Sequence, residues 1–305
     1  MENVNCNLCG ENDYKIFKVF SDNYKLVKCN NCGLVYLNPR PKEEEMSEEY
    51  NENYHVDKIL QSLPSGEKEI NNEINKNLGR INEINKLKEN INNRKVLDIG
   101  CGAGFFLAGM KRSGWTVRGI EISDWAKNYA EEVLKLDVEY SSVEEADYKE
   151  EFDVITMFHV LEHLPDPSDS LLKISKFLKK DGLLFIKGPN FGSFDRMWHG
   201  KKWKGYSDKT HLYYFNIESY KNILIKNNFS ISEVKPQNWN PFFHILETFS
   251  GDGLKADHPS GFVQNRYQKL INNPIIKVLN KMLLIFPYIF NIKGRDVTII
   301  AKKRS

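Results

Sequence analysis

The chain of 305 residues is long enough for one large domain with attachments, and its 41% of hydrophobic residues suits a globular enzyme. A net charge of +2 gives no support to a dedicated nucleic-acid surface. The polar start, with two cysteines in Met1–Gly10, argues against a secretory signal, and no apolar run reaches the ~18–20 residues of a membrane span, so we expect a cytoplasmic protein.

Two Cys-x-x-Cys pairs lie near the start of the chain. Cys6 and Cys9 form the first pair, and Cys29 and Cys32 form the second. This spacing predicts a four-cysteine zinc site built from two knuckles, in a zinc-ribbon-like module over residues 1–45. Four thiolates fill the coordination sphere of zinc, so the site would be structural. Disulfides are the alternative, but they are rare in the reducing compartment expected for this chain.

A helical segment precedes the first strand of the main domain. Its apolar residues recur at intervals of three and four, which predicts one amphipathic helix that leads into the strand. We expect its apolar face to pack in the core. The residues of this face are Ile70, Ile74, Leu78, Ile81 and Ile84.

A glycine-rich run marks the next turn. An apolar strand contains Asp98 near its end, and the chain then passes through Gly100, Gly102 and Gly104 into an apolar helix start. This G-x-G-x-G spacing differs from the G-x-G-x-x-G run of dinucleotide sites. Because glycine lets a ligand approach the backbone closely, the run indicates a nucleoside site without a pyrophosphate. A tight strand-to-helix turn without a ligand is the alternative.

Acidic and polar residues follow the next predicted strands. Residues 115–121 form a strand that ends at Glu121, whose carboxylate can accept hydrogen bonds from both hydroxyls of a ribose. An exposed carboxylate beside a helix start is the alternative. A short strand over 138–143 ends in a polar turn, and a buried strand over 152–158 leads into a loop with His159. Ligands bind outside the carboxyl ends of strands in open α/β sheets, so we expect His159 where a substrate meets the ligand.

The glycine run resembles the first motif of class I S-adenosylmethionine-dependent methyltransferases, and the phrase HVLEHLPDP at 159–167 resembles a large subgroup of them. The resemblance implies an α/β fold with a Rossmann-like seven-stranded sheet that binds S-adenosyl-L-methionine. An aspartate often stands in the family at the position of Ser142, and the backbone N–H of Val143 is the substitute contact for the adenine. The implied cofactor site consists of Asp98, Gly100, Gly102, Gly104, Glu121, Ile122, Ser142, Val143 and Phe158.

The phrase CGLVYLNPRP at 32–41 resembles methyltransferases with an N-terminal zinc-binding region, which commonly occur in sugar and polysaccharide modification. This second resemblance implies a sugar, glycan or lipid-linked glycan as the acceptor. Nucleic acid is not an expected partner, and the oligomeric state stays open.

Further strands complete the predicted sheet. Residues 182–190, 229–234 and 296–302 are predicted strands, and the last two resemble the antiparallel pair with which class I methyltransferases end. The expected domains after the cysteine module are a helical connector over 46–93 that also covers the cofactor, a methyltransferase domain over 94–235 and 293–305, and a mainly helical insertion over 236–292.

Two segments are expected to recognise the acceptor. Residues 189–214 mix aromatic rings with basic and amide side chains, which suit the ring faces and hydroxyls of a glycan. Residues 274–291 are apolar on more than one side, which fits a buried helix or a dimer contact, or else an interfacial helix that reaches a lipid-linked substrate on a membrane. The acceptor residues expected in the first segment are Asn190, Arg196, Trp198, His199 and Trp203, with core packing as the alternative for the tryptophans.

His159 and His211 are the two candidates for a general base. The sulfonium already activates the methyl group, whereas a sugar hydroxyl is a weak nucleophile that benefits from a base. As an alternative to a general base, His159, Glu162 and His163 would together bind a metal ion. We therefore expect O-methylation of a sugar or glycan hydroxyl. The alternatives are C-methylation of a nucleotide-linked keto sugar and, from a different class, a zinc-ribbon protein that binds or modifies RNA.

Overall fold

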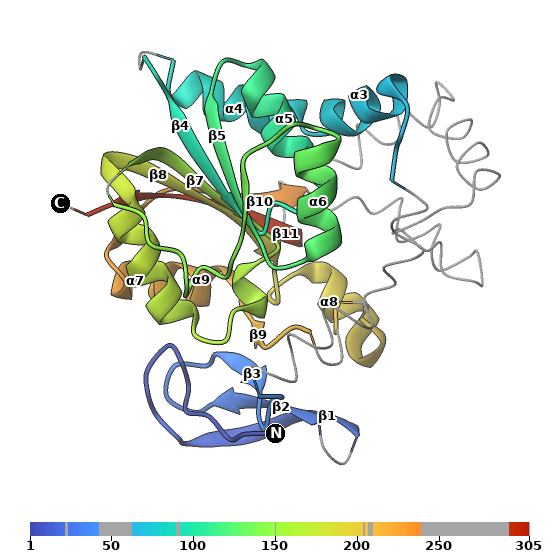
Figure 1. Ribbon diagram of the computed structural model, residues 1–305. Coiled ribbons are helices and arrows are strands. Elements are labelled where there is room, and N and C mark those ends of the chain that lie inside the picture. Colours follow the sequence, from blue (N-terminus) through green and yellow to red (C-terminus); the bar gives the residue numbers. More distant parts are fainter. Residues whose placement is uncertain are drawn as a thin grey trace, which may run out of the picture.

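The computed structural model describes residues 1–21, 24–42, 63–89, 92–149, 151–203, 205–206, 210–238 and 293–304. These residues form two sheets, with helices packed around the larger one (Figure 1). The first part of the expected connector and almost all of the expected insertion, including residues 274–291, lie outside the described residues. Within the described ranges, no helix is long and apolar enough to cross a membrane.

The larger sheet has seven strands in the order β10-β11-β8-β7-β4-β5-β6. Five neighbouring strands are parallel, namely β4 (Lys95–Ile99), β5 (Thr116–Glu121), β6 (Val138–Tyr140), β7 (Phe152–Phe158) and β8 (Leu178–Pro189). β11 (Lys293–Lys303) pairs antiparallel with β8 and with β10 (Phe229–Asn238). The predicted sheet is confirmed, including the antiparallel pair that ends it.

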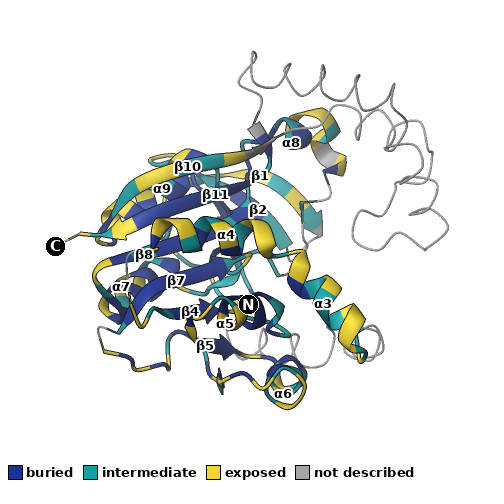
Figure 2. Cartoon of the chain, turned by 90° about the horizontal axis from the view of Figure 1, so that it is seen from above, coloured by how far each residue is buried: buried dark blue, intermediate teal, exposed yellow. Residues whose placement is uncertain are grey.

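Alternate side chains of the central strands enter two different cores. Leu97 and Ile155 belong to the core that α7 (Pro167–Phe177) and α9 (Ile217–Lys226) cover. Val96 and Val154 belong to the core on the opposite face, together with residues of α3 (Glu67–Asn75), α4 (Leu78–Leu87), α5 (Phe105–Arg112) and α6 (Asp124–Glu132). Because helices cover both faces, β7 is buried along almost its whole length (Figure 2).

The helix predicted from the apolar series at 70–84 is in fact two helices, α3 and α4. The side-chain amide of Asn77 donates to the carbonyl oxygen of Glu73 at 3.0 Å, which a continuous helix would pair with the backbone N–H of Asn77. That N–H donates instead to Ile74 at 2.9 Å. The apolar face continues across the break, because Ile74 and Ile81 are both buried.

The smaller sheet is antiparallel and contains β1 (Tyr14–Ser21), β2 (Tyr24–Cys29), β3 (Val35–Leu37) and β9 (Tyr213–Tyr214), in that order. Its first three strands belong to the cysteine module, but β9 comes from the end of the expected acceptor segment. The N–H of Leu37 also donates to the carbonyl oxygen of Leu212 at 2.9 Å. The cysteine module and the acceptor segment therefore share one sheet, which lies beside the larger one (Figure 1).

Candidate active site

The glycine run crosses from the end of β4 to the start of α5. The backbone N–H groups of Gly100 and Cys101 both donate to the carbonyl oxygen of Ile120, at 2.8 and 3.2 Å. The N–H of Gly102 donates to Glu121 Oε2 at 2.7 Å. The loop is therefore fixed to the carboxyl end of β5, on the side of the sheet where open α/β folds bind their ligands.

The three glycines of this loop have different functions. A Cβ added to Gly100 would lie 2.5 Å from Val160, and one added to Gly104 would lie 2.5 Å from Leu136, so the packing of the protein itself requires both glycines. A Cβ added to Gly102 would meet no described atom within 4 Å, and the φ of +53° favours glycine there. Gly102 thus borders open space, as expected for a loop that holds a ligand against its backbone.

Glu121 ends β5 with a buried carboxylate, which is 8% exposed. In addition to the contact with Gly102, its Oε1 accepts hydrogen bonds from the N–H groups of Ile122 and Ser123 at 3.0 and 2.9 Å. Burial raises the pKa of Glu121, and these three hydrogen bonds oppose the rise. A carboxylate offers about four acceptor positions, so one position is left for a ligand hydroxyl. The alternative of an exposed carboxylate does not apply.

Asp98 lies near the end of β4 and is almost completely enclosed. The hydroxyl of Thr156 on β7 donates to its Oδ1 at 2.5 Å. Burial raises the pKa of Asp98 to about 7, although this hydrogen bond and the charge of Arg80 oppose the rise. Arg80 reaches the site from α4, and its guanidinium lies 4.6 Å from the centre of the Phe158 ring. The sequence patterns single out neither Arg80 nor Thr156.

The other expected cofactor residues lie at the ends of β5, β6 and β7. Ser142 forms a turn in which its hydroxyl accepts from the N–H of Glu145 at 3.2 Å and its own N–H donates to Glu145 Oε2 at 3.1 Å. Val143 is buried, whereas Ile122 is 41% exposed. Phe158 meets Phe106 edge-on, with 5.1 Å between the ring centres. Because β5, β6 and β7 run parallel to β4, these three strand ends lie at the same edge of the sheet as the glycine loop.

His159 follows β7 in a left-handed backbone conformation, with φ at 60°. Its Nδ1 lies 3.6 Å from Glu162 Oε1, and its Nε2 lies 3.7 Å from Asp296 Oδ2. Asp296 also pairs with Lys187 Nζ at 3.2 Å. The ring of His159 is 43% exposed, so it is accessible and lies between two carboxylates. The sequence does not point to Asp296, because only the pairing of β11 with β8 brings it to the site.

Glu162, His163 and His211 form a second group beside His159, with their ligand atoms within 4.8 Å of one another. Burial lowers the pKa of His211 to about 4 and also lowers that of His163. Burial raises the pKa of Glu162, but the neighbouring histidines outweigh it and hold the pKa below its ordinary value. Of the two base candidates, His159 has the accessible ring, whereas burial makes His211 a weaker base than an ordinary imidazole.

The structure separates the expected acceptor residues into different environments. Asn190 is fully buried; its Oδ1 accepts from the N–H of Gly192 at 3.0 Å, and its Nδ2 donates to the carbonyl oxygen of Gly294 at 3.2 Å. Trp203 is 3% exposed and donates to Asp195 Oδ2 at 2.8 Å. Both side chains therefore stabilise the segment itself, and neither is available to contact an acceptor as the sequence had suggested.

The other three residues lie on α8 (Phe194–His199), which a short turn, η2 (Gly200–Lys202), follows. The guanidinium of Arg196 lies 4.3 Å from the centre of the Phe191 ring. His199 Nε2 lies 3.4 Å from Asp195 Oδ1. Trp198 is 58% exposed and presents the most accessible ring of the set.

The four predicted zinc ligands bring their sulfur atoms within 4.8 Å of one another, and none of them forms a disulfide. In the first knuckle, Gly10 donates to the carbonyl oxygen of Cys6 at 2.7 Å, and Cys6 donates to that of Glu11 at 2.9 Å. In the second knuckle, the corresponding residues form the same two bonds at 3.1 and 2.9 Å. Both knuckles thus direct their sulfurs to one point, which is the arrangement that a tetrahedral metal ion requires.

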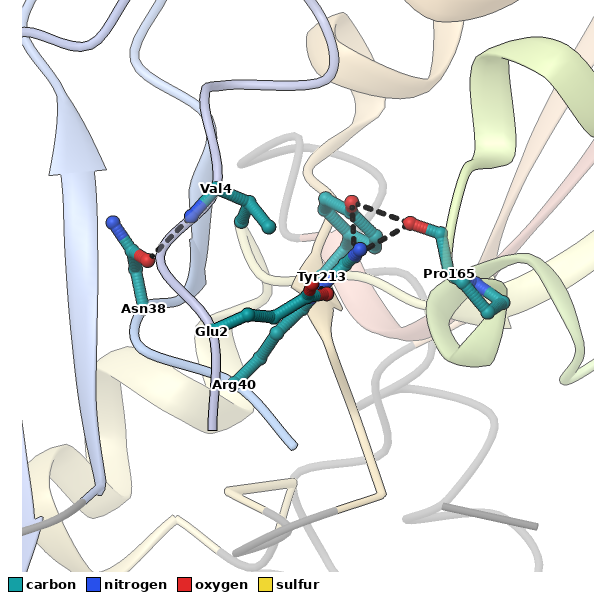
Figure 3. A network of polar contacts seen from close by, with 6 residues as sticks. All are labelled: Glu2, Val4, Asn38, Arg40, Pro165 and Tyr213. Carbon is teal, nitrogen blue, oxygen red and sulfur yellow. Dashed lines mark hydrogen bonds and ion pairs between the residues drawn. The ribbon is translucent and has the colours of Figure 1, made fainter. Parts of the chain in front are cut away.

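A polar network connects the cysteine module to the loop that follows β7 (Figure 3). Arg40 donates from Nη1 to the carbonyl oxygen of Pro165 at 2.5 Å and to the hydroxyl of Tyr213 at 3.1 Å. The same hydroxyl donates to Pro165 at 3.0 Å, and Arg40 Nε donates to Glu2 at 2.8 Å. The side-chain amide of Asn7 adds a bond to Asp166 Oδ1 at 2.8 Å. The loop with His159 is therefore held from the module as well as from the large sheet.

Comparisons with known proteins agree with this site. A methyltransferase domain family matches residues 68–234, which is more than half of the chain. The chain is 36% identical over 122 residues to the ubiquinone biosynthesis O-methyltransferase of Actinobacillus pleuropneumoniae serotype 5b, a match that covers 36% of this chain and 52% of that protein. It is 35% identical over 104 residues to the protein of the same name from Aromatoleum aromaticum, covering 32% and 44%. The chain thus spans about half the length of the curated relatives it matches.

One solved structure has a similar fold. Phosphoethanolamine N-methyltransferase 2 of Haemonchus contortus, in complex with S-adenosyl-L-methionine, matches with a TM-score of 0.50 and 20% identity over 76% of this chain and 53% of that one. At this identity the likeness concerns the fold alone. Taken with the family match, the seven-stranded sheet and the glycine loop, it shows that the chain belongs to the class I S-adenosylmethionine-dependent methyltransferases.

Proposed function

We propose that the protein transfers the methyl group of S-adenosyl-L-methionine to a hydroxyl of a sugar or glycan, with His159 as the general base. The observation that carries the proposal is the position of this ring. It is accessible, it lies between two carboxylates, and the next residue, Val160, packs directly against Gly100 of the cofactor loop. The base therefore lies next to the loop expected to hold the methyl donor.

The cofactor supplies a methyl group that its sulfonium already activates. We expect Glu121 to hold it through a ribose hydroxyl and Asp98 through its cationic amine, with the backbone of Gly102 beside it. Holding donor and acceptor in line then contributes most of the rate.

The proton of the acceptor hydroxyl moves to His159 while its oxygen bonds to the methyl carbon and the carbon–sulfur bond breaks. The imidazole gains a positive charge in this step. The carboxyl groups of Glu162, on the side of Nδ1, and Asp296, on the side of Nε2, lie 3.6 and 3.7 Å away, where they can stabilise that cation. Asp296 is thus a positioning residue for the base, and Lys187 fixes its carboxylate.

Two observations favour a glycan as the acceptor. Trp198 offers an exposed aromatic face, which suits the apolar face of a sugar ring. The run at 32–41 resembles sugar-modifying methyltransferases, and the acceptor segment joins its sheet through β9. The name of the curated relatives supports transfer to oxygen, although the match covers about half of those proteins.

We propose that Cys6, Cys9, Cys29 and Cys32 hold one zinc ion with a structural role. The four sulfurs lie within 4.8 Å of one another, and burial raises the pKa of the Cys32 thiol to about 11, so a cation is needed to keep the group ionised. Four thiolates leave no open position for a substrate. Zinc here would support the module and, through it, the loop after β7.

The expected cytoplasmic location stays a prediction, as does a peripheral membrane contact through residues 274–291. Nucleic acid is not among the proposed partners. The net charge of +2 supports neither a polyanion surface nor strong attraction to anionic lipid.

The test is a cofactor-dependent mass-shift screen of sugar nucleotides, glycolipids and RNA with the purified full chain. We expect one added methyl on a sugar hydroxyl in the wild type, and strongly reduced turnover in His159→Ala with unchanged cofactor affinity. A methyl on carbon, or on RNA alone, would contradict the proposal. Unchanged turnover in His159→Ala would remove this residue from catalysis.

A further inference from the structure

We propose that Glu162, His163 and His211 form a second metal site, distinct from the four cysteines, that binds a divalent transition-metal cation. Each of the three residues offers one ligand atom, and these atoms lie within 4.8 Å of one another. Two imidazoles with one carboxylate are a donor set that Zn²⁺, Mn²⁺ and Fe²⁺ accept, with coordination positions left over for an exogenous oxygen.

The strongest sign of a missing ligand is the carboxylate of Glu162. The residue is 1% exposed, yet neither of its oxygens has a hydrogen-bond partner among the described residues. His159 comes no closer than 3.6 Å, which is beyond hydrogen-bonding distance. Burying a carboxylate without hydrogen-bond partners destabilises the folded protein, so a cation at this point would offset much of that free-energy cost.

The surroundings of the carboxylate explain why the protein itself supplies no partner. Oε2 lies 3.1 Å from the position that a Cβ on Gly188 would take, so this stretch of β8 has no side chain to offer. The hydroxyl of Tyr220 is nearby, but it donates to the carbonyl oxygen of Pro189 at 3.4 Å. The sheet thus offers the carboxylate no partner, and its nearest other ligand atoms are those of the two histidines.

His163 is oriented as metal ligands usually are. His163 Nδ1 lies 2.7 Å from the carbonyl oxygen of Thr210, which assigns the ring proton to Nδ1 and the lone pair to Nε2. A backbone carbonyl on one ring nitrogen fixes the tautomer and the direction of the other nitrogen, as in known metal centres. The two rings lie 4.7 Å apart, centre to centre, and nearly perpendicular to each other at 72°.

The backbone holds the three ligands in register. Glu162 and His163 belong to the short turn η1 (Leu161–His163), and His211 belongs to the strand-like segment beside it. The N–H of Leu212 donates to the carbonyl oxygen of Glu162 at 2.9 Å, and Leu212 accepts in turn from Leu37 of β3. Ligands from two distant parts of the sequence are thus joined before any ion arrives.

A cation at this site would lie one side chain away from His159, because Glu162 Oε1 faces the Nδ1 of that ring. There it would lower the pKa of an acceptor hydroxyl and stabilise the developing oxyanion as a Lewis acid, while Asp296 remains the carboxylate that stabilises the protonated ring of His159. This role rests on the proposed function, whereas binding of the cation does not.

The test uses Mn²⁺, which prefers nitrogen and oxygen to thiolate ligands, so that zinc can stay in the cysteine module. Mn²⁺ is titrated into the purified full chain, and the free ion is followed by its paramagnetic resonance signal. We expect one Mn²⁺ per chain in the wild type, and an affinity lowered by more than about 100-fold in Glu162→Gln and His211→Gln. His199→Gln removes a partly buried histidine outside the cluster and should bind Mn²⁺ like the wild type.

Thermal unfolding with and without Mn²⁺ shows whether the variants are folded. Mn²⁺ should raise the melting temperature of the wild type by mass action and leave that of Glu162→Gln unchanged. Absence of Mn²⁺ binding and of any second zinc ion in the wild type would overturn the proposal, as would unaltered binding in both folded variants. Binding without methylation of any sugar would leave the metal site standing and contradict the proposed function; methylation without binding would do the reverse.

Discussion

The guanidinium of Arg40 donates a hydrogen bond of 2.5 Å to the carbonyl oxygen of Pro165, and this contact joins the cysteine module to the loop that contains His159 (Figure 3). The side chain of Arg40 is only 12% exposed, so the bond is shielded from water. The module is therefore tied to this loop through a largely shielded charged donor on a backbone carbonyl.

Replacing Arg40 by glutamine should lower kcat and leave the affinity for S-adenosyl-L-methionine nearly unchanged. The substitution removes charged hydrogen bonds to Pro165 and Tyr213, so the free energy of unfolding should fall by about 1.5–3 kcal/mol. The loop that contains His159 would also be held less firmly, which lowers kcat. Denaturant unfolding and steady-state kinetics measure the two effects. Arg112→Gln is the matched control, because Arg112 bonds Asn71 on the exposed surface. Equal effects in both variants would contradict the special role of Arg40.

Glu121→Gln should weaken S-adenosyl-L-methionine binding at least tenfold. The carboxylate accepts three backbone hydrogen bonds, one of them from Gly102, and an amide group has only one oxygen to accept them. The side-chain NH₂ of glutamine would face a backbone N–H that now donates to the carboxylate, and the repulsion would displace the glycine loop. Calorimetric titration with the cofactor measures the loss. Glu131→Gln, on the exposed side of α6, should bind normally; a similar loss there would point to a general effect of charge.

The affinity for S-adenosyl-L-methionine should rise with pH below neutrality. Burial raises the pKa of Asp98 to about 7 without cofactor, so the folded protein holds this proton more tightly than the unfolded chain. The stability contribution of Asp98 therefore falls as the pH rises from about 4 to 7.

The cofactor carries a cationic amine that favours the ionised carboxylate, so binding should tighten by about fivefold between pH 6 and pH 7 as Asp98 loses its proton. Titrations at both pH values measure this ratio. In Asp98→Asn the ratio should be close to one. A wild-type affinity that does not change over this range would separate Asp98 from the amine of the cofactor.

Asp296→Asn should lower kcat about tenfold and leave cofactor binding intact. Asparagine keeps the shape of the side chain but removes the negative charge that faces His159 Nε2 and pairs with Lys187. Single-turnover kinetics with a methyl acceptor and calorimetry with the cofactor separate the two steps. Full activity in this variant would mean that Glu162 alone stabilises the protonated ring.

Cys29→Ser should release the zinc ion, and Cys101→Ser should retain it. Cys29 is a proposed ligand, whereas Cys101 packs in the glycine loop against Gly119, away from the cluster. The released zinc is measured with a metallochromic dye. Since a structural zinc site contributes folding energy outright, Cys29→Ser should also melt at a lower temperature. Zinc retained in full by Cys29→Ser would contradict the four-cysteine site.

Local sequence patterns were sufficient for the sheet and for the cofactor loop. The apolar strands, Asp98 and Glu121 at their ends and the three glycines all lie within short stretches of sequence, and the family resemblance adds the seven-stranded sheet with its final antiparallel pair. Residues that reach the site by long-range pairing were not predictable in this way. Asp296 lies beside His159 because β11 returns next to β8, and Arg80 reaches Phe158 from α4, which precedes the sheet in the sequence.

Polar residues in the acceptor segment show the same limit. Asn190 and Trp198 look alike to a search for glycan-binding side chains, since both are typical of such sites. The first is completely buried and bonds to backbone, and the second is 58% exposed. A residue type states which contacts are possible, while the tertiary fold decides whether the contact is made with the protein or with a ligand.

The short strand β9 has a consequence for how this enzyme can be recombined. Tyr213 and Tyr214 pair with β3 of the cysteine module, although in the sequence they lie between β8 and β10 of the large sheet. A chimera that replaced residues 1–42 alone would pair β9 with a strand from another protein in place of β3. It would also lose the hydrogen bond from Arg40 to Pro165. We therefore expect acceptor specificity to be transferred to another enzyme only when residues 190–215 are exchanged together with the module. The two segments form one structural unit despite the distance between them in the sequence.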